Sequence, residues 1–185
     1  MPILKNEPSI FPDSLLDEEA PRDESRRWQV LYTKARQEKA LARELFCQGV
    51  PFYLPLIAKD SIIRNRKVTS HVPLFMGYVF LLGTDDERLC ALQTNRISRI
   101  LDVEDAESLV HDLRQIEQLI AAGAPLTVES QLVPGNRVRV KHGPFAGLEG
   151  TVLQRRGKKH LLVAVNFLQK GASVEVEDFY LEPIG

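Results

Sequence analysis

The side chains that could catalyse a reaction or hold a metal are scattered along this chain of 185 residues. They are four histidines and two cysteines: His71, His111, His142, His160, Cys47 and Cys90. No two of them have the close spacing of zinc ligands. The chain also lacks a G-x-S-x-G turn, a Walker loop and a G-x-G-x-x-G fingerprint. We therefore predict a protein that is not an enzyme and that needs no metal or cofactor.

Composition favours a globular protein of one domain or two small ones. Hydrophobic residues make up 44% of the chain and charged residues 26%, which suffices for a packed core. The apolar runs are too short to span a bilayer, and the N-terminus lacks the residue order of a signal peptide. We expect a cytoplasmic monomer without membrane contact, in which both cysteines are buried free thiols.

The net charge of −1 conceals an uneven distribution. Residues 1–24 carry seven acidic and two basic side chains, whereas residues 132–185 carry eight basic and five acidic ones. Acids and prolines predict that residues 1–26 form a disordered tail, although a small amphipathic turn at 14–16 could dock on another surface. The low net charge argues against avid non-specific binding to nucleic acid but leaves room for local basic patches.

Residues 27–122 predict a first domain of α+β class, in which strands and helices follow one another. Hydrophobic periodicity predicts strands at 28–33, 51–57, 74–82 and 97–103, helices at 34–48, 85–92 and 105–122, and a hairpin with a basic tip at 64–67. The segment 74–82 is nearly all apolar and should be the central buried strand.

The composition changes at residues 123–131, which we interpret as an interdomain linker because of their glycine, proline and small polar residues. Residues 132–185 show no helical period. Five short strands are expected there, and the stretch VPGNRVRVKHGPFAGLEG predicts a sharp turn around Phe145 between two of them. This part of the chain therefore predicts a small all-β barrel, a type of module that binds RNA or protein.

Two motifs in this order resemble the NusG family of transcription elongation factors. The first is W-x-V-x-Y, starting at Trp28, followed by P-L-F-x-G-Y-V-F at Pro73 to Phe80. The second is G-x-R-V-R-V-x-x-G-P-F-x-G-x-x-G, a KOW motif. The resemblance covers about residues 26–185. It implies an NGN-type antiparallel sheet with flanking helices at 27–122, linked to an SH3-like KOW barrel at 132–185.

The resemblance also implies partners. In that family the first domain binds the clamp helices of RNA polymerase near upstream or non-template DNA, and the barrel binds a further protein such as a ribosomal protein or Rho. By motif position, the polymerase contact falls on Tyr32, Tyr78 and Phe80, with Leu74 and Phe75 as weaker candidates. The basic residues near DNA would be Lys34, Arg36, Arg64, Arg66 and Lys67. The barrel contact would fall on Phe145, Phe167, Leu168 and Lys170. Spacing alone places Tyr78 and Phe80 on one face of a strand, which equally suits a core face.

Two positions depart from the family pattern. Met76 stands where a proline is frequent, and Gln169 stands where housekeeping members usually have glycine. The second departure resembles specialised paralogues such as RfaH, which suppress pausing on selected operons. The valines of the barrel favour strand, so we do not expect its refolding into helices.

An alternative function also stands: an RNA-binding or ribosome-associated KOW protein. It would contact phosphates through a basic turn made of Arg155, Arg156, Lys158 and Lys159.

Overall fold

The computed structural model describes residues 7–177 and 180–185. The chain divides into two compact units, Met1–Glu104 and Asp105–Gly185. The first six residues of the predicted tail lie outside the described part. None of the described helices is long and apolar enough to cross a membrane.

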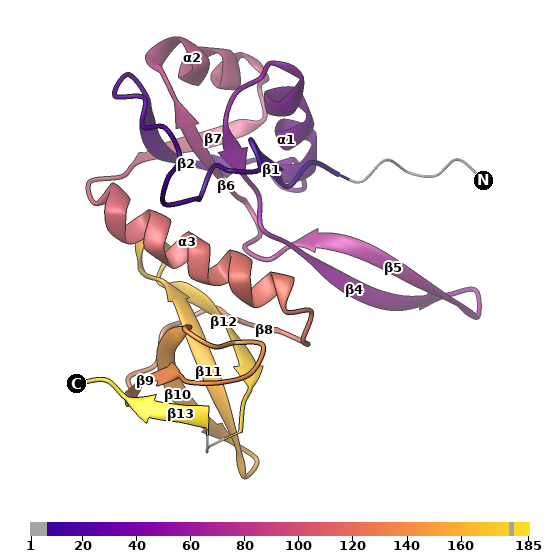
Figure 1. The fold of residues 1–185 in the computed structure, drawn as a ribbon. Coiled ribbons are helices and arrows are strands. Elements are labelled where there is room, and N and C mark those ends of the chain that lie inside the picture. Colours follow the sequence, from indigo (N-terminus) through magenta and orange to yellow (C-terminus); the bar gives the residue numbers. More distant parts are fainter. Residues whose placement is uncertain (1–6, 178–179) are drawn as a thin grey trace. The chain divides into compact units, whose positions relative to one another are not determined.

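The first unit is built on a five-stranded sheet with the order β1-β3-β6-β2-β7, in which every pairing is antiparallel (Figure 1). Its strands are β1 (Ile10–Phe11), β2 (Arg27–Thr33), β3 (Phe52–Tyr53), β6 (Tyr78–Gly83) and β7 (Ile97–Asp102). Its helices are α1 (Glu38–Cys47) and α2 (Asp85–Gln93). The strand predicted to be central, β6, holds the middle of the order, but it begins at Tyr78 because Gly77, with φ of +88°, ends a turn.

The core of this unit lies between the sheet and its helices. Leu41 and Leu45 of α1 share a helix face and are fully buried against the sheet residues Leu31, Val79 and Leu81. Alternation along β6 directs Val79 and Leu81 to the same side. The fold therefore uses the apolar stripe that the periodicity of α1 predicts.

The N-terminal segment is ordered over its described part, where disorder was predicted. Ile10 and Phe11 pair with Tyr53 and Phe52 as an edge strand, and Leu16 is buried. The ring of Phe11 packs edge-on against Phe46, with centroids 5.4 Å apart. Acids and prolines give this segment the composition of a disordered tail, but a few apolar side chains suffice to dock it.

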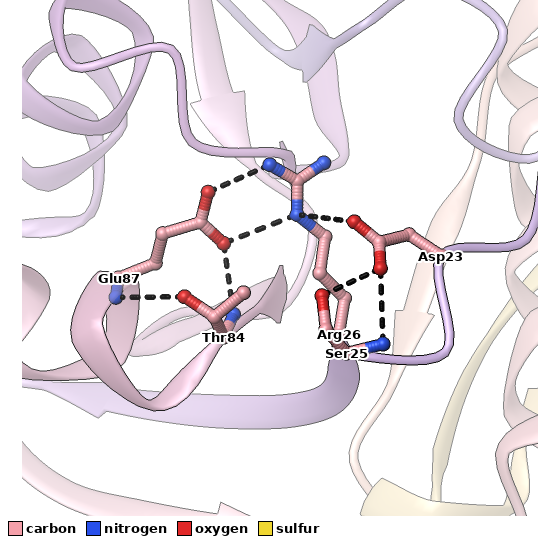
Figure 2. Close-up of polar contacts among 5 residues, drawn as sticks. All are labelled: Asp23, Ser25, Arg26, Thr84 and Glu87. Atoms are coloured by element: carbon pink, nitrogen blue, oxygen red, sulfur yellow. Dashed lines mark hydrogen bonds and ion pairs between the residues drawn. The ribbon is translucent and has the colours of Figure 1, made fainter.

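The end of the same segment is tied to α2 by Arg26 (Figure 2). Its guanidinium donates to the two carboxylate oxygens of Glu87 at 2.7 and 3.2 Å and lies 3.8 Å from Asp23. Glu87 in turn completes a capping box with Thr84 at the start of α2. One carboxylate thus both caps the helix and anchors the chain that enters β2.

A separate two-stranded hairpin, β4 (Leu56–Ile63) and β5 (Arg66–Pro73), extends from the first unit (Figure 1). Arg64 and Asn65 connect the strands with φ of 48° and 62°, the conformation of a two-residue primed turn. The predicted hairpin with its basic tip is confirmed.

The second unit contains a helix and a six-stranded sheet with the order β13-β9-β10-β11-β12-β8 (Figure 1). Its elements are α3 (Ala106–Ala121), β8 (Thr127–Glu129), β9 (Arg137–Val140), β10 (Glu149–Arg155), β11 (Lys158–Val165), the 3₁₀ turn η1 (Asn166–Leu168), β12 (Lys170–Glu175) and β13 (Leu181–Pro183). No pairing between the described residues of β13 and β8 closes this sheet, so the SH3-like barrel stays a prediction.

Helix α3 belongs to the second unit, although its place in the sequence predicts that it belongs to the first domain. Its buried Asp112 accepts hydrogen bonds from the backbone nitrogen and the amide of Asn166 at 2.9 and 3.1 Å. Desolvation by burial raises the pKa of Asp112. Gln115 and Gln118 bond to the backbone of residues 149 and 146. These polar contacts to β10, to η1 and to the turn before β10 could not be read from the apolar period of the helix.

The predicted linker contains strand β8, which pairs with residues 171–173 of β12. Its last residue, Glu129, is buried and accepts two hydrogen bonds from Arg155, at 2.7 and 2.9 Å, and one from Ser173 at 2.5 Å. The segment is therefore part of the sheet rather than a free connection.

Both cysteines of the chain are free, as expected, but they are exposed rather than buried. Cys47 ends α1 and Cys90 lies within α2. The prediction of burial rested on how often thiols are buried in general, which does not specify a helix face.

Candidate protein-docking site

Tyr32 and Tyr78 form a partly exposed aromatic pair at one end of the first unit's sheet. They are directly opposite each other on β2 and β6, so their side chains share a face. The ring centroids lie 5.2 Å apart with an interplanar angle of 49°. Tyr32 is 43% exposed and Tyr78 is half-buried. Arg99 of β7 is exposed and opposite Tyr32 on its other side, which adds a cation to the edge of this surface.

Gly77 and Glu38 hold this pair in place. A Cβ atom at residue 77 would lie 3.0 Å from the Tyr32 ring, so the ring is seated against a glycine backbone. The buried carboxylate of Glu38, in the first turn of α1, accepts a hydrogen bond of 2.7 Å from the Gly77 nitrogen. The Gly77 carbonyl accepts another, of 2.8 Å, from the Thr33 nitrogen. The turn before Tyr78 is thus fixed to both β2 and α1.

Replacing Glu38 by alanine should destabilise the first unit by about 1–3 kcal/mol, because the Gly77 N–H would lose its acceptor. Urea unfolding of the full chain measures this loss. Glu38→Gln is the matched control, since its amide oxygen can still accept the bond, and it should retain most of the stability. Equal losses in both variants would show that the carboxylate charge, rather than the hydrogen bond, supports this turn.

Three of the predicted polymerase contacts do not lie on this surface. Phe80, Leu74 and Phe75 are all buried, and their contact with polymerase stays a prediction. Phe80 shares a face with Tyr78 but lies further along β6, where it pairs with Val30 and Tyr53. The two-residue spacing correctly predicts that Tyr78 and Phe80 share a face of the strand. It does not predict that Phe80 is buried. Met76, one of the two departures from the family pattern, is 78% exposed and lies two residues before Tyr78 in the sequence.

The predicted DNA contacts form two groups. Lys34 and Arg36 lie in the connection between β2 and α1, both exposed, and Lys34 donates to Asn95 at 2.7 Å. The other group, Arg64, Arg66 and Lys67, surrounds the hairpin turn. Lys67 forms an ion pair of 2.9 Å with Asp60.

The predicted partner contacts of the second unit are only partly at the surface. Phe145 is buried and anchors the turn between β9 and β10, so it is a core residue. Phe167 is 37% exposed, and Leu168 and Lys170 are half-buried. Gln169 has a left-handed φ of 52°, a conformation in which glycine is the least strained residue.

The basic turn of the alternative function is partly neutralised. Arg155 is held by Glu129, and Lys158 donates to Glu175 at 2.8 and 3.0 Å. These ion pairs raise the pKa of both basic groups and reduce the charge that they offer to phosphates. In residues 7–177 and 180–185, no group of three or more His, Cys, Asp or Glu side chains is arranged to hold a metal.

Comparison with known proteins identifies the class of protein. A family model described as "Transcription termination factor nusG" matches residues 26–133, more than half of the chain, which places it among transcription factors. More particularly, the chain belongs to the NusG family, as the first sequence motif, which lies within the matched residues, indicates.

Two solved structures are similar to the chain. One, described as "Domain interaction in Thermotoga maritima NusG", is 18% identical with a TM-score of 0.49, and the match covers 86% of this chain and 98% of that chain. The other, described as the MjSpt4:Spt5 complex in conformation B, is 16% identical with a TM-score of 0.26, covering 85% and 96%.

Proposed function

We propose that this protein is a transcription elongation factor that binds the clamp helices of RNA polymerase through Tyr32 and Tyr78. Membership of the NusG family supports a role in transcription elongation. The observation that carries the contact itself is the partly exposed tyrosine pair, which Gly77 and Glu38 hold in place. Tyrosines favour protein interfaces because each supplies a large apolar surface with little side-chain entropy to lose.

Binding of this kind would act on the polymerase by population shift. A factor that prefers the closed clamp stabilises that state by the difference between its affinities for the two states. A bound factor of this kind would disfavour the paused state, and so would suppress pausing and modulate termination. The protein would act as a cytoplasmic monomer, with residues Phe167, Leu168 and Lys170 recruiting a ribosomal protein or Rho, and it would serve selected operons in the manner of RfaH.

Replacing Tyr32 and Tyr78 by alanine should weaken polymerase binding at least about tenfold, since central aromatic anchors dominate interface energies. Both side chains are at least partly exposed, so the unfolding midpoint should change little. Binding to immobilised RNA polymerase measures the first effect, and urea unfolding measures the second.

Leu89→Ala is a suitable control for this pair, because Leu89 is an exposed apolar residue of α2 in the same unit. It should bind polymerase like the wild type. Normal binding by the tyrosine variant would refute the assigned contact surface. An equal loss of polymerase binding in the Leu89 variant would indicate that the variants are misfolded.

Nucleic acid would be a secondary contact of this factor. The exposed residues Lys34, Arg36, Arg64 and Arg66 would lie near the phosphates of upstream or non-template DNA. The alternative function, RNA binding through the turn at Arg155 to Lys159, predicts an RNA affinity that falls steeply with salt. A shallow salt dependence for the full chain would argue against it.

A further inference from the structure

Three exposed apolar side chains at the tip of the β4–β5 hairpin have no role in the proposed function. Ile62 is 78% exposed, Ile63 55% and Val68 40%. Every residue from 58 to 71 is exposed, so these side chains do not pack into the core of the unit. A cluster of branched apolar groups in water at the end of a projecting element indicates a contact surface.

The apolar groups project from both faces of the hairpin. Ile62 pairs with Lys67, while its neighbour Ile63 pairs with Arg66. Side chains alternate along a strand, so Ile62 projects from one face and Ile63, with Val68 beside it, from the other. A patch that docks on a folded protein gathers on one face. Apolar groups on two faces suit an element that is inserted between two surfaces.

The charges at the tip of the hairpin indicate which kind of partner it binds. Residues 59–67 carry four basic side chains (Lys59, Arg64, Arg66 and Lys67) and one acid, Asp60. Asp60 is neutralised by Lys67 and accepts a further hydrogen bond of 2.6 Å from Thr69. The net positive charge complements phosphates, which favours nucleic acid over an apolar protein surface.

We propose that the hairpin tip is a wedge at the junction where duplex DNA separates into single strands, with Ile62 and Ile63 against the terminal base pair and Arg64 and Arg66 on the flanking phosphates. Apolar side chains inserted at a base step unstack it, and the cost is lowest where one side is already unpaired. The primed turn at Arg64 and Asn65 keeps the tip narrow. The inference rests on the DNA contact of the proposed function and adds the apolar residues that would open the junction.

The test uses the full chain and a forked DNA with 2-aminopurine at the last base pair before the two arms. The wild type should raise the 2-aminopurine fluorescence by about twofold as the base unstacks. Ile62→Thr with Ile63→Thr should abolish this rise while weakening DNA binding by less than about threefold, because phosphate contacts supply most of the affinity. Threonine keeps the β-branched shape that the strand favours. Val128→Thr, at an exposed valine of β8, is the matched control and should behave like the wild type.

A second variant separates the wedge from the DNA contact itself. Arg64→Ser with Arg66→Ser should lower affinity for all DNA sequences and reduce the salt slope by about 1–2. A full fluorescence rise with the threonine pair would overturn the wedge and leave the DNA contact standing. Unchanged affinity of the arginine variant would overturn both, and polymerase binding through Tyr32 would be unaffected.

The same variants also test whether the tip contacts protein instead of DNA. If the threonine pair weakens binding to polymerase without nucleic acid, the tip contacts protein and the wedge is wrong. Altered self-association of that variant in sedimentation would likewise assign the tip to a second copy of this chain.

Discussion

Gly150→Ala should unfold the second unit at a temperature at which the wild-type unit remains folded. An alanine Cβ at this position would lie 2.2 Å from the carbonyl oxygen of Leu162 and 3.0 Å from a methyl carbon of Leu161. The oxygen belongs to the backbone of β11, which is paired with β10 on one side and β12 on the other, so it cannot move aside. Overpacking that cannot relax should cost at least about 3 kcal/mol, the upper end of its usual range.

Such a loss should lower the melting temperature of this unit by about 12 °C or more. Hydrogen–deuterium exchange of the full chain, read peptide by peptide, measures the stability of β10 and β11 separately from that of the first unit. Wild-type protection in these strands of the alanine variant would contradict the predicted clash.

Gly147→Ala is the matched control. Gly147 has a φ of +89°, but a Cβ there would meet nothing within 4 Å. Its replacement should cost only about 1 kcal/mol of backbone strain. Equal effects of the two substitutions would mean that the close approach of β11 adds no cost at residue 150.

Glu129→Ala should destabilise the second unit by about 2–3 kcal/mol, less than a fully buried ion pair because Arg155 is partly exposed to solvent. The substitution removes the acceptor for Arg155 and leaves the hydroxyl of the buried Ser173 without its partner. It should also release β8 from the edge of the sheet. Faster amide exchange in residues 127–129 and 171–173, together with a lower unfolding midpoint, would show both effects.

Glu175→Ala is the matched control, because Glu175 is also a carboxylate that forms an ion pair with a basic residue of the same sheet. Its pair with Lys158 is exposed on both sides, so the substitution should cost less than about 1 kcal/mol. If Glu129→Ala is as stable as Glu175→Ala, the hydrogen bonds of Glu129 with Arg155 and Ser173 do not anchor the sheet.

The contribution of Glu129 should depend on pH with a defined sign. The hydrogen bond from Arg155 lowers the pKa of Glu129 in the folded state. A carboxyl with a lowered folded pKa stabilises the fold above its unfolded pKa, about 4.3, and loses that contribution as pH falls through the folded pKa. Denaturation of the wild type and Glu129→Gln at neutral pH and below pH 4 should therefore show a difference that shrinks in acid.

Long periodic segments could be predicted from the sequence. The stripe of Leu109, Leu113 and Ile116 predicts a helix at 105–122, and α3 spans Ala106–Ala121. The strands β1 and β8 could not be predicted, because strands of two and three residues show no period. Each is defined by a partner far along the chain, β3 for one and β12 for the other.

The candidate site, too, was predictable only where it follows a periodic pattern. Alternation assigns Tyr78 and Phe80 to one face of β6. It does not show that Phe80 lies between paired residues of β2 and β3 while Tyr78 begins the strand. The support from Glu38 and Gly77 depends on the approach of α1 to a turn 39 residues away.

Strand β1 has a consequence for any shortened version of this protein. Composition suggests that the folded part starts near residue 26, but a fragment cut there would lack β1 and expose the backbone of β3 as a sheet edge. It would also uncover the site that buries Leu15 and Leu16. An unprotected edge beside apolar side chains is a template for pairing between molecules. Strand β1 therefore protects the edge of β3, and we expect a fragment that starts near residue 26 to self-associate more than the full chain.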